Sequence, residues 1–211
     1  MSCHCTRIHD RRRIVVTGGP GSGKTAILEF VRRAFCRHVN VLPEAASILF
    51  GGGFPRGIRT AELRAAQRAI FHVQSELEAW SDGGQAPAIT LCDRGTLDGL
   101  AYWPGDPNEL LLAMRTTVET ELNRYAAVIH LRPPAATGGY NHENRLRTES
   151  AEEAALLDAR IEAAWEAHPH RIVVESTHNF LDKVLRAVEL LRVELPECCG
   201  ESLKPFTSLT V

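Results

Sequence analysis

The chain has 211 residues, 44% of them hydrophobic, and a formal net charge of −2. This size fits one α/β domain with a single core and argues against two independent domains. Because charges of both signs are interleaved, the sequence excludes a global basic field for nucleic acid, and we expect no nucleic-acid partner.

The N-terminal segment MSCHCTRIHDRRR precedes an apolar run, IVV, that is too short for a signal peptide or a membrane span. Its Cys and His residues are potential zinc ligands, but a single C-x-C pair fits structural zinc spacings poorly. We therefore predict a flexible tail over residues 1–12. The six cysteines do not have the spacing of a secreted disulfide framework, which favours a reducing cytoplasm and no membrane partner.

Short apolar runs then alternate with segments of helical periodicity. The sequence predicts strands over residues 14–16, 39–42, 88–92, 127–131 and 172–175, separated by helices over 24–35, 60–80, 108–125, 151–167 and 180–193. Strands that are joined by helical crossovers are parallel, with functional sites at their carboxyl ends. We therefore predict an α/β domain over residues 13–195, a three-layer sandwich with a five-stranded parallel sheet, and a C-terminal tail over 196–211.

A phosphate-binding loop motif, G-x-x-x-x-G-K-[ST], spans residues 18–25 between the first strand and the first helix. Its glycines can adopt positive φ and turn backbone amides inward as an anion nest, to which the helix dipole adds positive potential. We expect Lys24 to span the β- and γ-phosphates of ATP, with GTP left open, and the Thr25 hydroxyl to ligate Mg²⁺. The predicted nucleotide site comprises Gly18, Gly19, Gly21, Ser22, Gly23, Lys24, Thr25 and Ala26.

The third strand ends in AITLCDRG, where Asp93 is followed by Arg94 and not by a second acid. Motor and regulatory ATPases usually carry an acidic pair here, whose second carboxylate activates water. The Asn-Lys-x-Asp element of guanine-specific GTPases does not occur in the sequence either. Both features favour phosphoryl transfer over hydrolysis.

Four segments, GGPGSGKT, LPEAA, GGGFPR and DRGTLDGLAYW, together resemble the small AAA-type P-loop family that includes the ribosylnicotinamide kinase domain of bacterial NAD regulators. The layout is also similar to that of the nucleoside and nucleotide kinases, over about residues 13–193. The resemblance implies a kinase-like P-loop NTPase fold and a bound nucleotide. In deoxynucleoside kinases, a carboxylate resembling Glu44 handles the acceptor hydroxyl, and an acidic-Arg pair resembling Asp93 and Arg94 serves metal or phosphate.

The positions of the two acids in the predicted sheet agree with these roles. Glu44 follows the second strand and Asp93 the third, so both carboxylates reach the edge that carries the phosphate loop. We assign Asp93 to Mg²⁺ through water, and Glu44 to deprotonating or orienting the acceptor. The alternatives are a helix N-terminal carboxylate after Pro43 for Glu44, and a structural cap for Asp93.

Positive charge must meet the transferring phosphoryl group, because position and electrostatics stabilise its transition state. Arg94 is one candidate. Arg145 and Arg147 are the others, in a segment over about 133–149 that resembles the mobile lid of nucleotide kinases. The alternative for both lid arginines is a solvated face.

Recognition of the acceptor is expected near two further segments. ILFGGGFPRGIRT carries Arg56 and Arg59 where kinases of this layout admit the acceptor. Asp98 and Tyr102 share a helical face and could hold a sugar hydroxyl and a ring. The alternative is that Tyr102 and Trp103 pack as core or loop anchors.

The sequence thus predicts a cytoplasmic, monomeric or homodimeric kinase that moves the γ-phosphate of Mg-ATP to a small-molecule hydroxyl or phosphate acceptor, nucleoside- or nucleotide-like. Two alternatives stay open. One is a nucleotide-binding regulatory ATPase or GTPase with slow hydrolysis and no small-molecule acceptor, and the other is a kinase that acts on a macromolecule.

Overall fold

The computed structural model describes residues 5, 9–83, 87–134, 151–177 and 179–196. In this part of the chain, five parallel strands form one sheet in the order β2-β3-β1-β4-β5. The strands are β1 (Arg12–Thr17), β2 (Val39–Leu42), β3 (Ile89–Asp93), β4 (Ala127–Leu131) and β5 (Arg171–Val174). The predicted five-stranded parallel sheet is confirmed, with strand ends that differ from the prediction by two residues at most.

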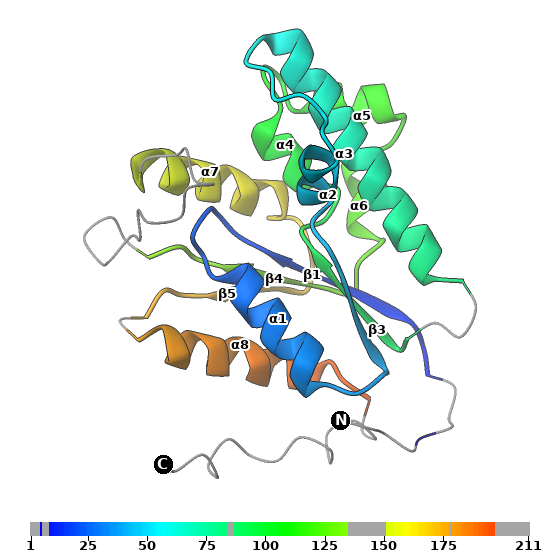
Figure 1. Ribbon diagram of the computed structural model, residues 1–211, viewed down its shortest axis with the longest axis vertical. Helices are drawn as coiled ribbons and strands as arrows, with labels where there is room; N and C mark the ends of the chain where they lie inside the picture. The colour runs from blue at the N-terminus through cyan, green and yellow to red at the C-terminus, as the bar shows by residue number, and fades with distance from the viewer. Residues whose placement is uncertain (1–4, 6–8, 84–86, 135–150, 178, 197–211) are drawn as a thin grey trace.

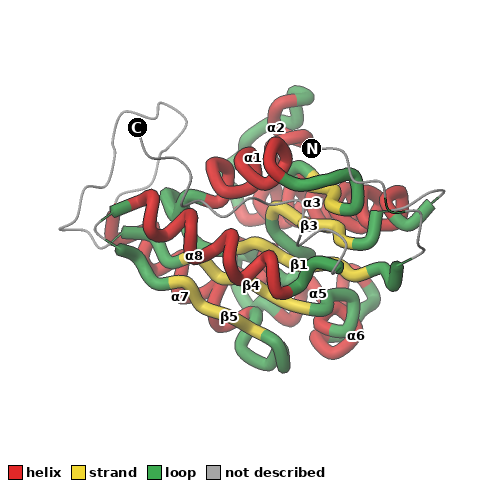
Figure 2. The backbone as a smooth tube through the Cα atoms, turned by 90° about the horizontal axis from the view of Figure 1, so that it is seen from below, coloured by secondary structure: helices red, strands yellow, loops and turns green. Residues whose placement is uncertain are grey.

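Helices cover both faces of the sheet (Figures 1 and 2). One face carries α1 (Lys24–Ala34) and α8 (Phe180–Val193). The opposite face carries α3 (Thr60–Ser81), α4 (Asp98–Tyr102), α5 (Asn108–Met114), α6 (Val118–Leu122) and α7 (Ala151–Ala164), while the short α2 (Ala45–Gly51) follows β2. The three-layer sandwich is therefore confirmed. No helix in the described ranges combines the length and apolar character that a bilayer span needs.

The side chains of β1 alternate between two buried faces of the sheet, which explains the unbroken apolar run IVV in this strand. Ile14 and Val16 belong to the core cluster under α1 and α8, whereas Val15 belongs to the cluster under α4 and α7. A parallel strand that is buried on both faces reads as an unbroken hydrophobic run. The run IVV thus lies in the central strand of the sheet, and the loop that follows the strand begins at the carboxyl edge of the sheet.

Register brings the ends of three neighbouring strands together. Val16 of β1 pairs with Asp93 of β3, and Leu42 of β2 pairs with Cys92 of β3. Residues 18–25, Asp93 and Glu44 therefore follow adjacent strands at one edge of the sheet. This edge is where open α/β sheets bind ligands.

The predicted helix over 108–125 was wrong, because two short helices occupy this segment. Arg115 ends α5 in a left-handed conformation, with φ of 56°. Thr117 begins α6, its hydroxyl accepting a hydrogen bond from the Thr120 N–H. The apolar spacing continues across this break, so periodicity alone did not reveal the N-capping threonine. The predicted helix over 151–167 likewise ends earlier, at Ala164.

We predict that Gly18→Ala destabilises the fold far more than Gly53→Ala. Both glycines have positive φ, 133° and 95°, and a side chain there is strained. A Cβ on Gly18 would also press against the Leu131 carbonyl, whereas no atom lies within 4 Å of a Cβ on Gly53. Urea unfolding should show a loss of about 3–5 kcal/mol for Gly18→Ala and about 1–2 kcal/mol for Gly53→Ala. Equal losses would contradict the close approach of β4.

Candidate nucleotide and acceptor site

The phosphate loop joins β1 to α1. Gly18, Gly21 and Gly23 have positive φ, of 133°, 80° and 91°. The positive φ that we predicted for Gly19 was wrong: this glycine is needed for close packing, since a Cβ there would lie 2.8 Å from the Asp158 Cβ. Its N–H donates to Asp158 Oδ1 at 2.6 Å. The α7 helix therefore holds the loop through a carboxylate.

Lys24 lies buried at the start of α1, with 8% of its surface exposed. Its Nζ donates to the carbonyls of Gly18 at 2.7 Å and Gly19 at 3.1 Å, and to Ser22 Oγ at 3.2 Å. Burial, and then the charge of Arg94, lower the pKa of Lys24 to about 7. A nearby phosphate would restore the charged form, because an opposite charge favours ionisation. Thr25, the next residue, is exposed.

Asp93 ends β3 beside this lysine. Its Oδ1 is buried and has no hydrogen-bond partner among the described residues. Burial, and then the negative charge of Glu44, raise its carboxyl pKa to about 6. A buried carboxylate oxygen without a protein donor is a ready ligand for a hard cation, and the exposed hydroxyl of Thr25 adds a second oxygen. This donor set fits Mg²⁺.

Arg94 links the ends of the central strands. Its N–H donates to the Val16 carbonyl at 3.1 Å, and its side chain reaches Glu44 Oε1 at 2.7 Å and Asp98 Oδ1 at 3.0 Å. Its Nη1 also lies 3.3 Å from the Gly18 carbonyl of the phosphate loop. Arg94 adopts a φ of 71°, a strained conformation that costs about 1–3 kcal/mol. The ion pairs hold this guanidinium at the edge of the sheet.

Glu44 precedes α2 and faces Arg94. Glu44 is the N-cap residue of α2, which is the position that the alternative of a helix N-terminal carboxylate predicted, although its side chain makes no capping hydrogen bond. Oε1 accepts from Arg94, and Oε2 accepts from the Ser47 hydroxyl at 2.5 Å. Burial opposes ionisation, but the charge of Arg94 and both hydrogen bonds outweigh it and lower the pKa of Glu44. The carboxylate is therefore ionised near neutral pH.

Asp98 borders the acceptor cavity and anchors this network. It is 3% exposed and accepts from Arg94, the Thr17 hydroxyl, the Gly95 N–H and the Trp165 indole. These donors engage both carboxylate oxygens, and the ion pair holds Arg94 in place. The sugar-binding role expected for Asp98 stays a prediction.

The nearby aromatic residues divide between the core and the cavity. Trp103 is buried, donates to Glu109 at 3.3 Å and lies under Arg64, which agrees with the alternative that it packs as an anchor. Tyr102 instead lines a cavity beside Glu44 and lies 5.6 Å from the Arg94 guanidinium. Of Tyr102 and Trp103, Tyr102 is therefore the one that can contact a ligand in that cavity.

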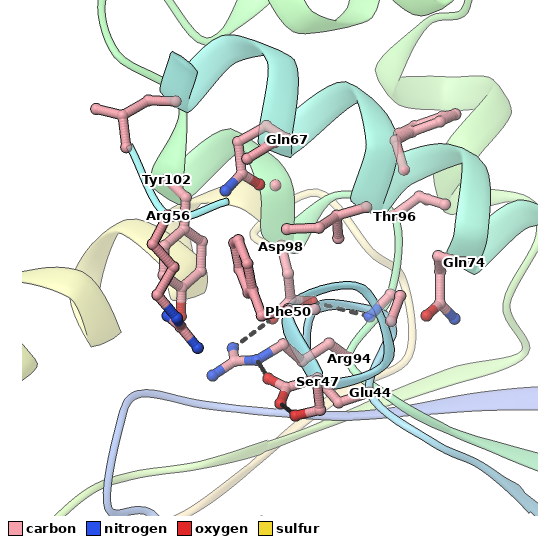
Figure 3. Close-up of a pocket in the computed structure, with 18 of the residues that line it drawn as sticks. Glu44, Ser47, Phe50, Arg56, Gln67, Gln74, Arg94, Thr96, Asp98 and Tyr102 are labelled. Carbon is pink, nitrogen blue, oxygen red and sulfur yellow. Dashed lines mark hydrogen bonds and ion pairs between the residues drawn. The ribbon is translucent and has the colours of Figure 1, made fainter. Parts of the chain in front are cut away.

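A cavity of about 480 Å³ opens between α2, α3 and α4 next to Arg94 (Figure 3). Gln67 and Gln74 project from α3 on one side, opposite Glu44 and Arg94. Phe50 also lines it, with the guanidinium of Arg56 4.2 Å from its ring centre. A cavity of this size with aromatic walls and a few polar groups is typical of small-molecule sites.

Of the predicted arginines that the structure describes, Arg59 does not line this cavity. Arg59 is exposed and pairs with Glu62 at the start of α3, away from the cavity lining. Arg145 and Arg147 lie outside the described residues, as does nearly all of the expected lid over 133–149. Among the predicted arginines, Arg94 and Arg56 are the ones that the described structure brings to the cavity.

The phosphate loop is held by residues that the sequence analysis did not identify. Asp158 accepts from Gly19 and contacts the buried His130 at 2.9 Å, and Lys183 of α8 donates to the Ser22 carbonyl at 2.7 Å. Asp158 lies on the same buried face of α7 as Ala154 and Ile161. An acid on an otherwise apolar helix face is a signal that could have identified it.

These features define a P-loop α/β protein with a kinase-like layout. The family described as an AAA domain matches residues 13–183, and the chain belongs to that family. No curated protein sequence is significantly similar to it.

Several solved kinase structures share the fold at low identity. A deoxyadenosine kinase from M. mycoides with bound dATP is 14% identical with a TM-score of 0.54, over 86% of this chain and 99% of the kinase. A thymidylate kinase from Candida albicans is 12% identical with a TM-score of 0.54, over 89% and 94%. NadR protein in complex with NR is 13% identical with a TM-score of 0.61, over 87% of this chain and half of NadR. The predicted nucleoside- and nucleotide-kinase-like fold is confirmed.

We predict that Asp93→Asn stabilises the protein without nucleotide or Mg²⁺. A carboxyl whose pKa rises on folding from 3.8 to about 6 supports the fold below about pH 4 and loses that contribution as the pH rises through 6. At pH 7.5 the variant should therefore gain on the order of 1–3 kcal/mol over the wild type, and the gain should vanish at pH 4. Urea unfolding at both pH values measures it.

The exposed Asp10 provides the matched control, since Asp10→Asn removes one carboxylate without touching the site. Its stability should stay within about 0.5 kcal/mol of that of the wild type, as is usual for an exposed substitution. A loss of stability in Asp93→Asn at pH 7.5 would contradict the unpaired, buried carboxylate.

Proposed function

We propose that the protein is a magnesium-dependent kinase that transfers the γ-phosphoryl group of ATP to a small nucleoside- or nucleotide-like acceptor. One observation carries this proposal: the Glu44–Arg94 ion pair lies between the phosphate loop and the cavity. A group that contacts both a nucleotide loop and a second cavity is positioned for transfer between two ligands. A protein that only hydrolyses ATP has no need of the second cavity.

The two charged groups have distinct proposed roles. Glu44 is ionised and borders the cavity, so it can accept the proton of an acceptor hydroxyl as phosphoryl transfer proceeds. Arg94 is held by three acceptor groups, which fixes its cation close to the loop before substrates bind. A preorganised cation stabilises the charge that develops on the transferring phosphoryl group.

The nucleotide is proposed to bind along the loop, with its phosphates at the N-terminus of α1. Lys24 contributes the local positive charge, and its low pKa makes it responsive to an incoming polyanion. Thr25 and Asp93 are the residues that would hold Mg²⁺, which supplies neutralisation of the β- and γ-phosphate charge. The unsatisfied Asp93 oxygen supports this assignment.

The chemistry of the cavity supports a planar, hydrogen-bonding acceptor. Phe50 and Tyr102 offer aromatic surfaces, and the amides of Gln67 and Gln74 offer donors and acceptors on the opposite side. A volume of about 480 Å³ accommodates a nucleoside-sized molecule. The similar folds with bound dATP and NR belong to proteins that handle nucleotides or their precursors, in agreement with this acceptor class.

One observation favours a second function, that of a nucleotide-dependent regulator with slow hydrolysis. Both oxygens of Glu44 already accept hydrogen bonds, from Arg94 and Ser47. If this pairing persists during turnover, Glu44 sets a conformation and takes no proton.

Incubation with Mg-ATP and a panel of nucleosides, nucleotides and vitamins separates the two functions. ADP release that depends on one class of acceptor, with an acceptor mass gain of one phosphate, supports the kinase. Identical slow ADP release with every compound overturns the kinase and supports the regulator.

For the accepted substrate, we predict that Glu44→Gln lowers the rate of transfer by about 10²- to 10⁴-fold, the usual scale for loss of a general base. Affinity for ATP should change less than about twofold, because glutamine still accepts the hydrogen bond from Arg94. Steady-state kinetics and nucleotide titration measure the two effects.

Ser47→Ala is the matched control, because it removes a hydrogen bond to Glu44 but keeps its carboxylate and the Arg94 ion pair. Its rate should stay within about tenfold of the wild type. A normal rate in Glu44→Gln would contradict the general-base role and leave Glu44 with a structural role alone.

A further inference from the structure

Three metal-ligating side chains meet at the amino ends of β1 and β2, at the edge of the sheet opposite the phosphate loop. Cys5 and His9 precede β1, and His38 immediately precedes β2. One ligand atom of each residue lies within 4.8 Å of those of the other two. Among the described residues, this is the group whose ligand atoms gather in this way.

Two sulfur–nitrogen distances at this cluster match that of a tetrahedral zinc site. Zinc–sulfur and zinc–nitrogen bonds at the tetrahedral angle set sulfur and nitrogen about 3.5 Å apart. Cys5 Sγ lies 3.5 Å from His9 Nε2. The buried Cys36 brings a second thiol, with its Sγ 3.5 Å from His38 Nδ1. A thiol and two imidazoles are ligand types of zinc sites.

Other contacts hold the two segments of the cluster together. The Arg37 guanidinium donates to the Cys5 carbonyl at 2.7 Å, and the rings of His9 and His38 pack edge to face with centres 5.0 Å apart. The His38 carbonyl accepts from the Ile89 N–H at 2.9 Å, which fixes this residue to the sheet. The ligand geometry is therefore partly set before a metal binds.

We infer that Cys5, His9 and His38 form a binding site for a soft divalent transition metal, Zn²⁺, with the Cys36 thiol beside it. The metal would tie the residues before β1 to the start of β2. This site lies at the opposite edge of the sheet from Glu44 and Asp93. The inference therefore does not depend on the proposed kinase activity.

Cobalt titration of the reduced, metal-stripped full-length protein tests this inference. One equivalent of Co²⁺ should produce the near-ultraviolet charge-transfer absorption of a cobalt–thiolate bond, and Zn²⁺ should displace it. Carboxylate sites such as that of Asp93 produce no such band, so the signal is specific for a thiol. Absence of the band in the wild type would overturn the site.

Variants assign the ligands. Cys5→Ser should abolish the band, and His9→Gln should weaken zinc binding by at least about tenfold in competition with a chromophoric chelator. Both residues precede β1 and are only partly buried, so circular dichroism should show a folded protein for each. If the band survived in Cys5→Ser, the proposed ligand set would be wrong.

Two control variants exclude other sites. His72→Gln removes an exposed histidine from α3 and should leave the affinity for zinc unchanged. The double variant Cys198→Ser/Cys199→Ser should keep the cobalt band at full intensity. Loss of the band in that double variant would place the metal at the C-terminal thiols and overturn the cluster.

Discussion

The geometry of the candidate site depends on the buried ion pair between Asp98 and Arg94. Asp98 is almost fully enclosed, and its four donors come from β1, the segment after β3 and the indole of Trp165. Removing one partner of a buried pair leaves an uncompensated charge, which typically costs about 3–5 kcal/mol. That cost keeps Arg94 in its left-handed conformation and directs its guanidinium toward Glu44 and the phosphate loop. The acceptor cavity and the nucleotide loop are therefore joined through one arginine.

Two other charges are placed where the protein alone does not favour them. Lys24 is buried with a lowered pKa, and Asp93 is buried with a raised one. A polyphosphate would stabilise the ammonium, and a divalent cation would stabilise the carboxylate, because each is the opposite charge. These two buried charges thus lower the stability of the free protein, and the proposed ligands would stabilise them, as is common at functional sites.

Polar residues on the buried side of α3 form one wall of the cavity. Gln67, Gln74 and Glu78 lie on the same face of this helix, and all three are buried. Glu78 accepts from Arg124, Tyr125 and Gln74, so the inner end of the face is satisfied by the protein itself. Gln67 and Gln74 extend the same polar face to the cavity. A helix that is anchored by a buried charge network can hold such amides rigidly, which a specific acceptor site requires.

The sequence by itself determined the α/β class, the five strands and the position of the phosphate loop. These features depend on local signals: apolar runs, helical spacing and a glycine pattern followed by Lys24 and Thr25. The position of Glu44 and Asp93 at one edge also followed from the sequence, because the carboxyl ends of parallel strands coincide. Their catalytic and metal-binding roles stay predictions.

Only the tertiary structure decided which residues complete the site, because the deciding contacts join segments that are distant in the chain. Asp98 became an anchor for Arg94 because Trp165 and Thr17 pack against it. Gly19 serves close packing because Asp158 of α7 lies against it. In the same way, Cys5 and His38 form a pair of potential ligands only because the fold brings the residues before β1 close to the residue before β2. Spacing along the chain cannot reveal such pairs, since side-chain direction and burial are set by packing between elements.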